Sequence, residues 1–258
     1  MVETVAVRRS RFWISHFTHS ASHPPNLDYS APGQLTNAEN QSISSSIQKF
    51  QLGEGSDGYH LILAAARYGE EFNDPDYLTA IRLFIKEEQR HSHDLGRFMN
   101  AENIPHIHAT YTDWIFRRIR RFGNSLEGML RTLLVAETIA LVYYSALRDA
   151  TRSTLLKQIC ERILEDEAHH LQFQTERLAI LSRYRSSLRN LFATCAHIGL
   201  YTGAVGVVWL DHRKVFQSGG YGLARYVRSC FHEFSEVLAA IERQQRAQRR
   251  YSLLRHAG

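Results

Sequence analysis

Apolar residues recur at helical spacing along most of the chain from residue 39 onward. The pattern predicts a first helical segment that ends at the stretch 73–77, followed by helices at about 76–100, 124–150 and 153–183. Two more helices are expected at about 186–214 and 221–248, and a short basic helix at 112–121 is an option. No segment alternates apolar and polar residues as a half-buried strand does. The pattern therefore predicts an all-α protein.

The lengths of the helices and of their connections indicate a four-helix bundle over residues 39–184. Residues 185–258 then form a helical hairpin packed on that bundle. Residues 1–38 hold three of the five prolines and show no sustained periodicity. We therefore expect residues 1–38 to be an extended N-terminal arm in which His16, His19 and His23 are solvated.

Ionisable residues interrupt the apolar stripes at positions that face the interior of a bundle. Glu88 and His91 lie three residues apart in the second helix, so they project from one face. The fourth helix repeats this spacing with Glu167 and His170, and the third carries Glu137 within an apolar stretch. Buried carboxylates are costly unless a cation compensates them. Two divalent metal ions would do so, because a Glu from each of two helices and a Glu-x-x-His pair from each of the others form a di-metal site.

The first helix must supply the missing glutamate, and Glu54 is the best candidate. It lies 34 residues before Glu88, as Glu137 lies 30 before Glu167, so both pairs are level in antiparallel hairpins. Glycines at 53, 55 and 58 leave two readings open: they admit close packing or substrate, or the helix begins only at residue 56 and Glu54 lies in a loop. The alternative ligands, at 70 and 71, lie near the turn.

Glu54, the EEQRH stretch at 87–91, Glu137 and the DEAHH stretch at 166–170 together resemble the ferritin-like di-iron carboxylate proteins. Relatives in that superfamily include rubrerythrin, the ribonucleotide reductase small subunit and the bacterial multicomponent monooxygenases. Within residues 40–184 the chain looks most like uncharacterised bacterial ferritin-like domain proteins. The resemblance implies six metal ligands, which are Glu54, Glu88, His91, Glu137, Glu167 and His170.

The resemblance also implies roles for residues next to these ligands. Glu87 and Asp166 directly precede the ligand glutamates, and each would orient a metal-binding histidine across the site. Arg90 matches the family's arginine before the histidine, whereas the second motif departs from the pattern with His169. Tyr144, seven residues after Glu137, could line the site, although core packing is the favoured interpretation.

Composition and charge narrow the chemistry further. The chain has 14 histidines but only three cysteines, Cys160, Cys195 and Cys230, too few and too spread for a disulfide framework or a cysteine zinc site. We expect a reducing, cytoplasmic location, no export signal, and no haem or nucleotide. A rubredoxin-like cysteine set is absent, so electrons would come from an external reductant. The net charge of +5 does not indicate nucleic acid binding.

Residues 191–210 contain no Asp, Glu, Lys or Arg, and Gly199 and Gly203 form a small-xxx-small pair. A run of this length could span a bilayer. We favour a helix buried against the bundle or a partner, with peripheral contact to a membrane surface as the alternative. A homodimer is an option.

The preferred function is an oxidoreductase that activates O2 or peroxide at the bundle centre. Its metal pair would be two iron ions, one manganese and one iron ion, or two manganese ions, and an apolar substrate is an option. One alternative is iron handling or peroxide scavenging without an organic substrate, as in ferritin and rubrerythrin relatives. Another is a non-catalytic helical binding module.

Overall fold

A computed structural model of the 258-residue chain describes residues 10–30, 34–109, 125–183 and 185–256, and the side chains only as far as residue 247. All regular elements in these ranges are α-helices, which confirms the all-α prediction. The described helices are α1 (Ser10–Ser22), α2 (Asn37–Glu54), α3 (Tyr59–Glu71), α4 (Asp76–Ala101), α6 (Leu126–Ala150), α7 (Thr154–Arg183), α8 (Ser187–Ser218) and α9 (Leu223–His256). The short basic helix expected at 112–121 lies outside the described residues.

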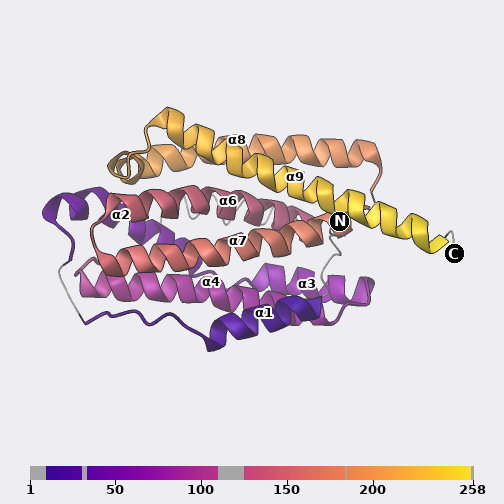
Figure 1. Cartoon of the computed structure of the whole chain (residues 1–258), viewed down its shortest axis with the longest axis horizontal. Coiled ribbons are helices and arrows are strands. Elements are labelled where there is room, and N and C mark those ends of the chain that lie inside the picture. Colours follow the sequence, from indigo (N-terminus) through magenta and orange to yellow (C-terminus); the bar gives the residue numbers. More distant parts are fainter. Residues whose placement is uncertain (1–9, 31–33, 110–124, 184, 257–258) are drawn as a thin grey trace.

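The bundle consists of α4, α6 and α7 together with α2 and α3, which follow one another along the same side of α4 (Figure 1). α2 begins at a capping box, in which Thr36 accepts from the backbone of Glu39 and the Glu39 side chain accepts in return. The single first helix predicted from periodicity is instead broken between Glu54 and Tyr59. Gly58 causes part of this break, since its φ of 62° lies in the left-handed region.

The core has two large apolar halves, one toward each end of the bundle, and a smaller third cluster of Leu134, Leu178, Val237 and Ile241. One half contains Leu61, Phe84 and Leu130, and the other contains Ile47, Phe98 and Leu156. In α4 and α7 the ionisable residues singled out from the sequence fall between the segments that build these halves. The packing therefore encloses a polar layer between two apolar ones.

The N-terminal segment differs from the extended arm that we expected. Residues 10–22 form α1, which packs against α4. Trp13 and Phe17 are 1% exposed and pack against Phe173, with ring centroids 5.2 and 5.4 Å away. Of the three histidines expected to be solvated, His19 and His23 are exposed, whereas His16 is half-buried. The expectation failed because the helix is short and its apolar residues are few.

α8 and α9 form a further layer on the bundle, with α8 against α6 and α9 against α7 and α6 (Figure 1). Two described helices, α6 and α8, have the length and hydropathy of a membrane span, and α6 is a core helix with 72% of its apolar window buried. The corresponding window of α8 is only 28% buried, and Phe192 and Leu210 are 67% and 71% exposed. Burial of the 191–210 helix is therefore confirmed for one face only.

Candidate metal centre

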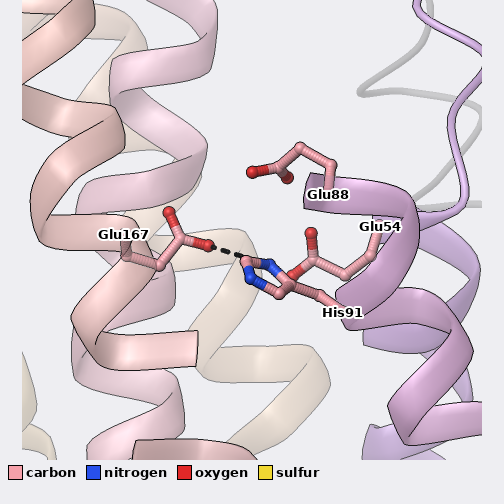
Figure 2. Close-up of side chains that lie close together, drawn as sticks. All are labelled: Glu54, Glu88, His91 and Glu167. Carbon is pink, nitrogen blue, oxygen red and sulfur yellow. Dashed lines mark ion pairs between the residues drawn. The ribbon is translucent and has the colours of Figure 1, made fainter. Parts of the chain in front are cut away.

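Side chains from four helices converge in the polar layer between the two core halves. α2 contributes Glu54 as its last residue, and α4, α6 and α7 contribute the rest. Two groups could each hold a metal ion, with ligand atoms no more than 4.8 Å from one another within a group. The groups are Glu54, Glu88, His91 and Glu167, and Glu88, Glu137, Glu167 and His170. Glu88 and Glu167 belong to both groups. Figure 2 shows the first, with Glu54 and Glu88 directed toward Glu167 across the bundle.

Glu54, rather than the alternatives at 70 and 71, therefore supplies the first-helix carboxylate. Glu70 and Glu71 are exposed near the end of α3. Neither reading of the glycines describes the geometry in full: Glu54 lies within a helix, but that helix ends there, and the next begins at Tyr59.

Each histidine of the cluster binds a carboxylate from the opposite helix. His170 Nε2 lies 3.0 Å from Glu87 Oε2, and His91 Nε2 lies 3.1 Å from Asp166 Oδ2. These are the crossed pairs that the motifs implied. A histidine that donates through Nε2 to a carboxylate carries its lone pair on Nδ1 when it is neutral. Both Nδ1 atoms face the glutamates of the cluster, with His91 Nδ1 3.9 Å from Glu167 Oε1.

Two arginines and a serine hold the orienting carboxylates in place. Arg90 donates to Glu87 at 2.9 Å and to Asp166 at 2.6 Å, and Arg162 donates to Asp166 at 3.1 Å. Ser20 of α1 donates to Glu87 and accepts from Arg162 at 2.6 Å. Sequence reasoning identified Arg90 but missed Ser20 and Arg162. Arg162 carries a local signal, because it lies four residues before Asp166 on the same helix.

Two further polar side chains position the outer glutamates. Tyr144 donates its hydroxyl to Glu54 Oε1 at 2.6 Å, so it contacts the cluster and also belongs to the core. Gln174 of α7 donates to Glu137 Oε1. Gln174 lies four residues after His170 on the same helix face, a spacing that could have identified it from the sequence.

The buried glutamates and histidines shift one another's pKa values. Burial raises the pKa of Glu88, but the His170 imidazole 2.7 Å away outweighs that effect and brings it to about 2. Burial lowers the pKa of His170, but Glu88, Glu167 and Glu87 together raise it well above its usual range. The protonated imidazole of His170 therefore stabilises the negative charge on Glu88.

The pKa values of the other three glutamates of the cluster are raised, in contrast to that of Glu88. Burial and the neighbouring carboxylates raise the pKa of Glu54 and of Glu137 well above the ordinary value, and burial together with Glu88 raises that of Glu167. These groups can carry full negative charge only if positive charge is added next to them.

Several buried atoms of the cluster have no hydrogen-bond partner among the described residues, and they point to the same place. They are His91 Nδ1, Glu137 Oε2 and Glu167 Oε2, together with Glu88 Oε1 and His170 Nδ1, which make no other contact of this kind than their own ion pair at 2.7 Å. Buried polar atoms are normally paired, so a set that converges on one centre needs an explanation. Carboxylate oxygen and imidazole nitrogen are also the donor atoms that divalent transition metals take. The residues therefore fit a metal site.

Comparisons of the chain with models of known protein families, with curated proteins and with solved structures find no match. What can be said of the chemistry therefore rests on the residues themselves. The chain is an all-α helical bundle with a buried cluster of glutamates and histidines that could bind metal.

Proposed function

We propose that this chain is a ferritin-like di-metal carboxylate oxidoreductase that acts on O2 or peroxide at the centre of its bundle. The observation that carries the proposal is the convergence on one centre of five buried oxygen and nitrogen atoms that make no hydrogen bond, two of which face each other as the ion pair of Glu88 and His170. Four glutamates and two histidines on four helices are the ligand set of the di-iron and di-manganese bundle proteins. The two groups of possible ligands share Glu88 and Glu167, which supports a pair of neighbouring ions.

In this proposal each metal position has its own glutamate and histidine. Glu54 and His91 would hold one ion, Glu137 and His170 would hold the other, and Glu88 and Glu167 would be available to both. The absence of cysteine from the cluster and its richness in carboxylate favour iron or manganese over zinc held by thiolates. When bound, such ions supply redox chemistry toward O2 or peroxide, with electrons from an external reductant.

The surrounding residues prepare the ligands for that role. Glu87 and Asp166 accept from the histidines through Nε2, so each imidazole directs Nδ1 toward the centre and would offer its lone pair there once a metal displaces the proton that His170 holds. Arg90 and Arg162 neutralise these two carboxylates, so the centre does not collect their negative charge.

The outer glutamates are positioned in a similar way. Tyr144 donates to one oxygen of Glu54, and Gln174 donates to one oxygen of Glu137, whose second oxygen makes no hydrogen bond with the described residues and remains for a metal. The two apolar halves of the core shield the cluster from water along the bundle axis, toward both ends.

Metal analysis of purified protein, expressed in medium supplemented with iron and manganese, tests the proposal. We expect close to two ions per chain by inductively coupled plasma mass spectrometry. Glu88→Ala and Glu167→Ala should each lose both ions, because each removes a shared ligand, while helicity by circular dichroism stays intact.

The matched control is Glu127→Gln, which changes a buried glutamate of α6 that pairs with Arg131 and Arg185 outside the cluster. It should keep both ions. Absence of metal from the unaltered protein, even after reconstitution, would overturn the proposal. Full metal content in both alanine variants would overturn the ligand assignment.

A further inference from the structure

A cavity of about 360 Å³ opens beside the glutamate cluster, where the first side of the bundle is broken between α2 and α3. We call it the entrance cavity. Glu54 and Glu88, which are half-buried, line it together with Asp57, Tyr59 and His60, which are exposed and therefore mark its mouth. Its volume is at the lower end of the roughly 300–1,000 Å³ typical of small-molecule sites. The cavity therefore reaches from the surface to two of the proposed metal ligands.

The helix break creates this opening. α2 ends at Glu54, and Gly58 starts α3 with a positive φ in direct contact with Ile85 of α4. A Cβ atom at Gly58 would lie 2.4 Å from Ile85 Cδ1, so no larger residue fits without a shift. One consequence is visible at the cluster: the Glu88 side chain is 18% exposed, whereas those of His91 and Glu167 are each 1% exposed.

Gly53 leaves part of the cavity open. It lies one residue before the end of α2, and a Cβ atom built there would meet nothing within 4 Å. Alanine is better than glycine inside a helix by about 1 kcal/mol, so helix stability does not explain this glycine. It does leave room in the cavity next to Glu54.

The chemistry of the walls indicates what the cavity takes. Apolar side chains line it beyond the mouth, and these are Leu61, Phe84, Ile85, Met129 and Leu133. A charged group placed against such a wall would lose its hydration without a partner. Asp57 at the mouth further disfavours an anion, whereas the hydroxyl of Tyr59 and the imidazole of His60 can hydrogen-bond a neutral polar group.

We propose that the entrance cavity binds a compact, uncharged amphipathic molecule, with its hydrocarbon part against the apolar walls and beside Glu54 and Glu88, and its polar group at the mouth. Binding of this molecule does not require the metals, but its role as the substrate of the metal pair rests on the proposed function. A route for ions or O2 alone would not require an apolar wall of this extent. Iron handling without an organic substrate would leave the cavity without a use.

Methionine labelling offers a test that does not depend on turnover. The chain has three methionines, of which Met129 lines the cavity and Met99 is buried in the other half of the core. The full-length protein, labelled with [13C-methyl]methionine, is titrated with 1-alkanols from 1-butanol to 1-octanol, and Met129→Leu assigns the signal. We expect the Met129 methyl resonance to shift saturably while that of Met99 stays in place. Each added methylene should tighten binding by about fourfold until the cavity is full.

Two comparisons make the result specific. Gly53→Leu should fill the cavity and remove the Met129 shift, whereas Gly203→Leu, on α8 with no atom within 4 Å of its Cβ position, should leave the shift intact. Hexanoate should bind at least tenfold more weakly than 1-hexanol, because the cavity disfavours an anion. An unchanged Met129 resonance in the unaltered protein would overturn the inference, as would equal binding of hexanoate or a full response in Gly53→Leu.

Metal analysis of the same samples separates this inference from the proposed function. Gly53→Leu should retain two ions per chain, since residue 53 supplies no ligand. A saturable Met129 shift in a protein that binds no metal would refute the proposed function and leave the cavity's ligand class standing. Two bound ions without any Met129 shift would refute the inference and leave the proposed function standing.

Discussion

Replacing a glutamate of the cluster should make the metal-free protein more stable while weakening its hold on metal. Glu137 is the most informative position, because its carboxylate is buried, with 4% of the residue exposed, and its raised pKa reflects burial and the nearby Glu167. Glu137→Gln keeps the volume of the side chain and an oxygen that can accept from Gln174. The substitution therefore removes the charge and little else.

The size of the effect follows from the spacing of the carboxylates. Two unit charges 4.8 Å apart, the limit for ligand atoms in this cluster, repel by about 3.5 kcal/mol in an effective dielectric of about 20. Closer carboxylates repel more strongly when both are charged, but the carboxyl escapes part of the repulsion by taking up a proton, which lowers the net effect. We expect Glu137→Gln to raise the free energy of unfolding of the metal-free protein by about 1–3 kcal/mol. About 2 kcal/mol corresponds to a rise in Tm of about 4–8 °C for a domain of this size.

Thermal unfolding in the presence of a chelator at pH 7, followed by circular dichroism, measures the change. Glu127→Gln is the matched control, because Glu127 is also buried in α6 but binds Arg131 at 3.0 Å and Arg185 at 2.8 Å. Glu127→Gln should lower the free energy of unfolding by about 2 kcal/mol, since the substitution removes hydrogen bonds to charged groups. Destabilisation by Glu137→Gln equal to that by Glu127→Gln would show that Glu137 is a structural residue and refute the reasoning.

Three further results are expected. Ser20→Ala removes the hydroxyl that joins α1 to α4 and α7. The free energy of unfolding, measured with urea, should fall by about 1–3 kcal/mol, and the metal content should not change. Gly219→Ala should lower the free energy of unfolding by about 1–3 kcal/mol, because the new Cβ atom would clash with the carbonyl oxygen of Ala146. Gly203→Ala, whose Cβ position is in open space, should raise it by up to about 1 kcal/mol. Equal effects of the two substitutions would contradict the packing of α8 on α6. The metal-free protein should lose stability as the pH rises from 7 to 8.5, because the folded protein holds protons on the carboxyls of the cluster and on His170, whose pKa values are raised. Below pH 7 the lowered pKa values of His197 and His212 act in the opposite direction. Urea midpoints that rise above pH 7 would contradict the pKa directions of the cluster.

The cluster itself was predictable from the sequence because its signals are local. Residues three apart on a helix share a face, so Glu88 with His91 and Glu167 with His170 could be identified one helix at a time. Apolar neighbours showed that these faces point inward, and the break in that apolar pattern marked the site. Glu54 needed one further step, the matching of hairpin lengths, and the structure places it in the cluster.

Other features could not be found this way, because they depend on contacts between distant parts of the chain. Ser20 and Glu87 are 67 residues apart, and the sequence around Ser20 contains no pattern that predicts their contact. α1 is short, and most of its stability comes from Trp13 and Phe17, which find their neighbours only after the bundle has formed.

The sequence by itself determined the helices from α4 to α9 that the structure describes and the chemical identity of the buried cluster, since both are set by periodicity within single helices. Only the tertiary structure decided where the bundle opens: the break after Glu54, the contact of Gly58 with Ile85 and the partial exposure of Glu88 follow from how α2, α3 and α4 fit together. It also decided that one face of α8 stays exposed, because α6 offers a surface to only one side of that helix. Periodicity specifies which residues turn inward, whereas packing between elements specifies where the interior can be reached.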